Sequence, residues 1–260
     1  MRSAAILLAA FAFLGQAHQV FAGPVYLRST VGQPWGQSTN ETAMDAVFGA
    51  GNWADSRYET VDTATLFSPA TNFIFMEGGD NNANALNAFL IANMPQIEAW
   101  VLAGGSLFVN AAPNEGGNIA FPFGVTLNYP GFSATATAVD PGNPIFNGPF
   151  TPVATSYTGN WFAHAFVSGS GITSLIDGTA GSVLAEGHFG QGYVLFGGMT
   201  TDNFHQPQPD AANLTANIIA FGAAQSNASV PEPASVALFG AMAIGGAVFG
   251  WRRREKAQAA

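Results

Sequence analysis

Five polar side chains and one Gly-Gly turn follow apolar runs, either directly or after the adjoining turn, and these positions could do chemistry. Glu77-Gly78-Gly79-Asp80 follows Phe73–Met76, Asn110 follows Leu107–Val109, and Asp202 and His205 come after Tyr193–Phe196. In an open α/β sheet, ligands bind beyond the carboxyl ends of the strands. We therefore expect a ligand crevice made of Glu77, Gly78, Gly79, Asp80, Asn110 and His205, with Asp202 nearby.

The chain lacks the usual nucleophiles. It contains no Gly-x-Ser-x-Gly elbow, no Gly-rich loop ending in Lys and no His-Glu-x-x-His. It also contains no cysteine, which removes thiol nucleophiles, zinc–thiolate sites and CxxC redox chemistry. A hydrolase would have to use His205 with the carboxylates of Glu77 and Asp202, with a metal held by these and by Asp80 and His188. We expect no cofactor and no dedicated metal site. The missing nucleophiles favour a protein that is not an enzyme.

The segment Asp80-Asn81-Asn82-Ala83-Asn84 matches the first ligand positions of a calcium loop. Ala85 stands where that loop needs glycine, and Ile91 stands where it needs glutamate. Helix capping by Asp80 or Asn82 is therefore the expected role. His164, in the alternating aromatic segment 161–166, is expected to be structural.

The elements that position these residues follow from apolar periodicity. Two continuous apolar runs with a helical segment between them predict a βαβ unit. We expect strands at 25–29, 58–61, 73–76, 107–109, 182–185 and 193–196, and helices at 40–48, 84–103 (starting anew or kinked at Pro95) and 211–221.

The region from about 114 to 170 is rich in Gly, Pro, Thr and aromatic residues, which predicts an inserted region of β-hairpins and loops. The expected fold class is α/β, with an open, mostly parallel sheet and helices on both faces. One such domain is expected over residues 23–225.

The predicted domain is strongly acidic. Without the two terminal signals, fourteen acidic side chains remain against two basic ones, Arg28 and Arg57, a difference of twelve. Such a surface repels phosphate backbones, so nucleic acid is excluded as a partner.

Both ends of the chain carry targeting patterns. Residues 1–22 have the charged start, apolar core and small-residue end of a signal peptide. At the other end, the linker and motif 226–233 precede an apolar segment at 234–251, expected to be a transmembrane helix, and a basic cytoplasmic tail at 252–260.

Pro231-Glu232-Pro233, the apolar segment and Arg252-Arg253-Arg254 closely resemble the PEP-CTERM sorting signal. That resemblance implies an exosortase as the processing enzyme and the inner membrane of a Gram-negative bacterium as a transient anchor. It also implies release to the cell surface or extracellular matrix, with exopolysaccharide as a candidate partner.

Four stretches of the predicted domain resemble the class I glutamine amidotransferase-like superfamily. They are Phe75–Gly79, Ser106–Asn110, Asn143–Gly148 and Gly197–His205. The resemblance implies a flavodoxin-like fold, oxyanion-binding amides at Gly78 and Gly79, and a histidine at His205. The family's cysteine would fall near Asn110 or Ala111, so we expect an inert crevice, no glutamine hydrolysis, and little change of stability in His205→Ala.

Two functions therefore compete. The first is an exported cell-surface or matrix protein whose non-catalytic domain serves in binding or matrix structure. The alternative is a periplasmic or surface hydrolase that uses His205 and nearby carboxylates.

Overall fold

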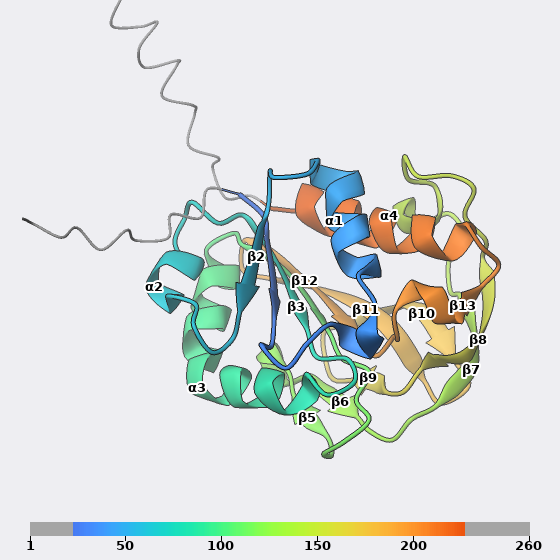
Figure 1. Cartoon of the computed structure of the whole chain (residues 1–260), viewed down its shortest axis with the longest axis horizontal. Helices are drawn as coiled ribbons and strands as arrows, with labels where there is room; N and C mark the ends of the chain where they lie inside the picture. Colours follow the sequence, from blue (N-terminus) through green and yellow to red (C-terminus); the bar gives the residue numbers. More distant parts are fainter. Residues whose placement is uncertain (1–22, 227–260) are drawn as a thin grey trace, which may run out of the picture.

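Thirteen strands join in one mixed sheet that forms the centre of the molecule (Figure 1). The structure is a computed structural model and describes residues 23–226. Ten strands follow one path, in the order β13-β8-β7-β10-β11-β12-β4-β3-β1-β2. The chain is therefore a mixed α/β protein, as the alternation of apolar periods predicted.

One half of the sheet is parallel. It contains β1 (Val25–Arg28), β2 (Ala54–Arg57), β3 (Phe73–Glu77), β4 (Ser106–Asn110) and β12 (Gly192–Gly197). The spatial order β2-β1-β3-β4-β12 has every neighbouring pair parallel. Numbered along the chain, this is the order 2-1-3-4-5 that flavodoxin-like sheets have.

The other half of the sheet is antiparallel, so the expectation of a mostly parallel sheet is wrong. Its strands are β7 (Ser133–Ala138), β8 (Ser156–Ala163), β10 (Thr173–Gly178), β11 (Ser182–Phe189) and β13 (His205–Gln206). A smaller antiparallel ribbon of β5 (Ile119–Ala120), β6 (Thr126–Asn128) and β9 (Phe166–Ser168) joins through β11. The region expected to hold an insertion of hairpins therefore extends the central sheet itself.

The predicted βαβ unit is confirmed. β3 and β4 are buried along their whole length and pair in parallel, with Phe75 opposite Phe108. The crossover helix α3 (Ala83–Leu102) runs unbroken through Pro95. Proline removes the hydrogen bond to the carbonyl four residues earlier, and that residue, Ile91, lies on the exposed side of the helix. Water can therefore satisfy the carbonyl, and no second helix start is needed.

Leu90→Ala is expected to lower the free energy of unfolding by about 2–5 kcal/mol. Leu90 is fully buried beneath the sheet, in the core that α3 shares with β3 and β4. The neighbouring Ile91 is 71% exposed, so Ile91→Ala is a matched control expected to change stability by less than about 0.5 kcal/mol. Denaturant unfolding of both variants checks this, and equal midpoints would contradict the assigned core.

Two hydrophobic cores lie on opposite faces of the sheet. α2 (Thr63–Leu66) and α3 cover one face, where Ile74, Met76 and Leu107 point. α1 (Thr39–Phe48) and α4 (Asp210–Ala224) pack together on the other face, over Phe73, Phe75 and Phe108. Figure 1 shows these two layers, with α1 and α4 at the top and α3 at the lower left. Helices on both faces are as predicted.

Two expected elements differ from the structure, and two observed elements were not expected. The second strand lies at Ala54–Arg57 and not at 58–61, and the aromatic segment 161–166 is divided between β8 and β9. β10 and α2 had no predicted counterpart. Short 3-10 turns complete the chain at η1 (Pro34–Gly36), η2 (Pro122–Gly124), η3 (Pro144–Phe146) and η4 (Asp202–Phe204).

Within residues 23–226, no helix has the length and apolar character needed to cross a membrane. The predicted signal peptide, apolar segment 234–251 and basic tail lie outside the described residues, as does most of the linker.

Candidate functional site

The Glu77 carboxylate lies at the carboxyl end of β3 and is 2% exposed. Three N–H groups donate to it: Asn40 Nδ2 at 2.9 Å, Asn110 Nδ2 at 3.4 Å, and the backbone N–H of Gly79. Asn40, on α1, also donates to the Tyr26 hydroxyl at 3.1 Å. Through these hydrogen bonds the buried carboxylate of β3 connects this strand to β4 and α1.

Burial raises the pKa of Glu77 from its ordinary 4.5 to about 7, against the opposing effect of its N–H donors. A carboxyl with this pKa can exchange a proton near neutral pH. No substrate proton can reach it here, because its oxygens face protein donors inside the core.

The predicted oxyanion-binding amides are already used. Gly78 N donates to the Asn110 carbonyl at 2.8 Å, and Gly79 N donates to the Glu77 side chain. Pro34 and Trp35 cover the turn, since a methyl group on Gly79 would lie 3.2 Å from Trp35 Nε1. The expectation that these amides hold a ligand oxygen is wrong, because intramolecular acceptors and the Trp35 ring occupy that place.

Asn110 lies where the amidotransferase-like resemblance places a nucleophile. Its side-chain amide instead bonds the backbone of Met199 at both of its polar atoms. Its Oδ1 accepts from Met199 N at 3.0 Å, and its Nδ2 donates to Met199 O at 2.9 Å. This pair joins the end of β4 to the loop after β12. The amide cannot rotate toward a ligand without breaking both bonds.

His205 is 3% exposed and its ring stacks on Phe162, with centroids 4.0 Å apart. Its Nε2 lies 3.0 Å from the Phe162 carbonyl and 2.9 Å from Thr200 Oγ1. A carbonyl can only accept, so Nε2 carries the proton. Burial lowers the pKa of His205 to about 3. The ring is therefore a poor general base at neutral pH, because a group with so low a pKa takes up a proton only weakly.

Asn110, Asp202 and His205 meet around a small cavity of about 20 Å³, which is room for one water molecule. Burial raises the pKa of Asp202. Of the sequence-predicted residues, Glu77, Gly78, Gly79 and Asn110 form one bonded group and Asp202 and His205 adjoin it through this cavity. The structure thus gathers these residues around a small cavity and not in an open crevice. Asp202 alone among them also lines a wider groove of about 540 Å³ between α1 and α4.

Asp80 faces outward, apart from that group. Its carboxylate accepts from Asn114 Nδ2 at 2.9 Å and from Asn81 Nδ2 at 3.3 Å. Asn82 is the N-cap residue of α3 but makes no side-chain capping bond. Its Oδ1 accepts from Ser29 N at 3.0 Å instead, so the expected capping role is wrong and Asn82 fixes the loop after β1.

Several residues at this edge were missed by sequence reasoning, above all Trp35 and Asn40. Trp35 adopts a left-handed backbone (φ 57°), which is uncommon for a bulky residue. Its indole packs edge-on against His164 at 4.8 Å and Phe204 at 5.6 Å, and Trp35 Nε1 is buried without an acceptor. The only sequence signal was a Gly/Pro-rich loop.

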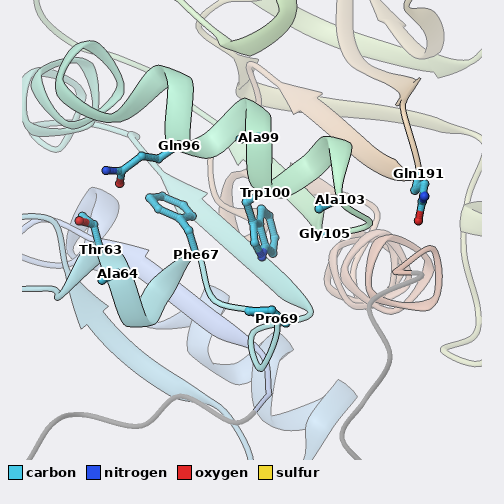
Figure 2. A pocket seen from close by; sticks show the side chains of 10 residues that line it. All are labelled: Thr63, Ala64, Phe67, Pro69, Gln96, Ala99, Trp100, Ala103, Gly105 and Gln191. Carbon is cyan, nitrogen blue, oxygen red and sulfur yellow. The ribbon is translucent and has the colours of Figure 1, made fainter.

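Elsewhere, the part of the chain that the structure describes holds no group of three or more His, Asp or Glu side chains placed to bind a metal. Figure 2 shows an apolar groove of about 620 Å³ at the opposite edge of the sheet, beside the amino ends of β4 and β12. Phe67 and Trp100 form its floor, and Gln96 and Gln191 stand at its sides. None of the predicted site residues lines it.

A family model described as the PEP-CTERM protein-sorting motif matches residues 229–254. The match supports an exported, surface-sorted protein that an exosortase processes. It covers the end of the chain and leaves the α/β domain unassigned. A search of curated proteins finds no match.

Solved structures resemble the domain weakly. A cold-adapted β-galactosidase from Rahnella sp. R3 has 11% identity and a TM-score of 0.47, over 76% of this chain and 31% of that one. A cytoplasmic protein from Salmonella typhimurium has 15% identity and a TM-score of 0.45, over 77% of this chain and 98% of that one. A β-galactosidase from Bacillus circulans sp. alkalophilus has 12% identity and a TM-score of 0.42, over 78% of this chain and 30% of that one.

This chain therefore spans about a third of the length of the two β-galactosidases. At these scores the likenesses carry no conclusion about activity, and they do not support the amidotransferase-like resemblance.

Proposed function

We propose that this chain is an exported cell-surface or matrix protein whose α/β domain binds and does not catalyse. The state of the predicted catalytic groups carries this proposal. The Nε2 of His205 is held by Phe162 and Thr200, both carboxylate oxygens of Glu77 accept protein N–H groups, and the Gly78 and Gly79 amides have acceptors. A catalytic site needs such groups free toward a substrate.

The amidotransferase-like ancestry belongs to this proposal as well. The order 2-1-3-4-5 of the parallel strands and the Gly-Gly turn after β3 favour a flavodoxin-like domain. In this proposal the domain retained the strand order of the family and lost the nucleophilic cysteine. The hydrolase alternative needs a metal or a free base. Glutamine or ester hydrolysis that disappears in Glu77→Gln would favour that alternative.

Sorting gives the direct test. In a host with an exosortase, we expect the mature protein to lack the segment from about Pro233 onward. Replacing Pro231, Glu232 and Pro233 by alanine removes the recognised motif, so the uncut chain should stay in the inner-membrane fraction. Intact-mass analysis of the membrane and released fractions measures both outcomes.

A matched control replaces Gln225, Ser226 and Asn227 by alanine, just outside the matched residues 229–254. This variant should be cut and released like the wild type. The same uncut mass in the wild type and in the motif variant would refute exosortase sorting.

A further inference from the structure

We propose that an aromatic surface at the carboxyl edge of the parallel strands binds a neutral polysaccharide through its pyranose rings. The surface consists of Trp35, Phe132, Trp161, His164 and Phe204. This inference rests on the proposed binding function and names its ligand class.

The five rings form one continuous series of contacts. Trp161 packs on Phe132 with centroids 5.5 Å apart and planes inclined by 39°, and Phe132 meets His164 edge-on at 4.9 Å. The edge-on contacts of Trp35 with His164 and Phe204 continue the series. These residues come from four separate segments of the chain, so the tertiary fold assembles the surface.

Two of the rings are open to a ligand. Trp161 is 42% exposed and Phe132 is 41% exposed. Among the described residues, these two are the exposed large aromatic side chains. Adjacent exposed aromatic rings mark interaction sites more often than isolated ones. Rigid rings bind at a low entropic cost, since few torsions are frozen.

Polar groups border the rings, as sugar recognition requires. The Asp80 carboxylate and the exposed Asn114 amide lie beside His164, whose Nδ1 is 2.9 Å from the carbonyl of Pro113. Asp80 has a left-handed backbone here (φ 50°), and its hydrogen bonds with Asn81 and Asn114 lie at the surface. A carboxylate and an amide bind hydroxyl groups by hydrogen bonds, while the rings bind the C–H faces of pyranoses.

Charge decides between a neutral and an anionic polymer. The only two cationic side chains of the described chain, Arg28 and Arg57, both pair with Asp55, on β2 at the far edge of the parallel half. Asp80 adds a negative charge at the aromatic surface itself. An anionic polysaccharide would meet repulsion and no cation, so a neutral polymer fits the surface.

The test uses the mature protein from an exosortase-bearing host, with affinity electrophoresis in gels that contain one polysaccharide each. The probes are barley β-glucan and galactomannan as neutral polymers, and alginate as an anionic one. We expect retardation by at least one neutral polymer. Trp161→Ala and Phe132→Ala should each weaken the apparent affinity at least about tenfold, in the range of an aromatic anchor.

Three further variants make the result specific. Trp161→Phe should keep most of the affinity, because it keeps a stacking ring and its packing on Phe132. Ile91→Ala removes a still more exposed apolar side chain, on α3, and should leave binding unchanged. Ala99→Trp fills the groove of Figure 2, where Ala99 lines the wall, and should also leave binding intact.

No retardation by a neutral polymer would overturn the inference, as would binding of alginate alone or binding unchanged in Trp161→Ala. Loss of binding in Ala99→Trp would move the site to the groove and overturn it too. Intact mass of the same samples reports sorting separately. A correctly cut protein that binds no neutral polymer refutes the ligand class alone, and an uncut protein refutes the proposed sorting.

Discussion

Replacing His205 by alanine is expected to destabilise the folded protein by about 2–4 kcal/mol, through the cavity it opens and the hydrogen bond it removes. The change deletes a ring that stacks on Phe162 and bonds its carbonyl at 3.0 Å. The sequence-based expectation of nearly unchanged stability is therefore reversed, because it treated His205 as a residue in an open crevice.

His188 provides the control, since it is an exposed histidine on β11. His188→Ala should shift the free energy of unfolding by no more than about 0.5 kcal/mol. Urea unfolding at pH 8 compares the two variants. If His205→Ala unfolds at the wild-type midpoint, the buried position of the ring is wrong.

The second prediction concerns the dependence of stability on pH. Glu77 has its pKa raised to about 7 in the folded state, so the fold favours its protonated form. That contribution is complete below the ordinary carboxyl pKa of 4.5 and is lost as pH rises toward 7. His205, with its pKa lowered to about 3, contributes stability that is present above its ordinary 6.5 and is lost as pH falls.

Between pH 4.5 and 6.5 these two contributions oppose each other. Glu77→Gln removes one of them, so the stability of this variant relative to the wild type should rise from pH 4.5 to 7, by up to about 3 kcal/mol. The other titrating groups are common to both proteins and cancel in the difference. Unfolding free energies measured at several pH values in this window give that difference directly.

The new side-chain amide in Glu77→Gln also places its own N–H groups against one of the protein donors, which lowers stability equally at every pH and leaves the slope intact. Glu98→Gln is a suitable control, because Glu98 is a partly buried α3 residue whose carboxylate accepts from Phe123 N at 2.8 Å. Parallel curves for the wild type and Glu77→Gln would show that Glu77 titrates at its ordinary pKa.

The sequence predicted elements well where burial alone decides them. β3 and β4 are buried on both faces and therefore are continuous apolar runs, and the amphipathic periods of α3 and α4 were equally clear. β2 was misplaced by four residues, because Ala54-Asp55-Ser56-Arg57 is a polar edge strand without an apolar period. Its place is fixed by the Asp55 carboxylate, which bonds Arg28 on the neighbouring β1.

The antiparallel half was predicted poorly for a related reason. β7 reads Ser-Ala-Thr-Ala-Thr-Ala, which is a weak strand signal, and β10 ends in Asp-Gly. Such segments become strands because neighbours supply a ladder of hydrogen bonds, which no local pattern reports.

The sequence by itself determined how this protein is sorted and which residues lie together at the candidate site. The sorting motif at 229–254 is a linear signal, and chain order after parallel strands was enough to bring Glu77 and Asn110 together. Only the tertiary structure decided what state those residues are in. Burial of Glu77 depends on Asn40, 37 residues earlier in the chain, and that of His205 on Phe162, 43 residues earlier. The aromatic surface likewise exists only once separate loops meet, since ring contacts and exposure are properties of packing and have no counterpart in local sequence.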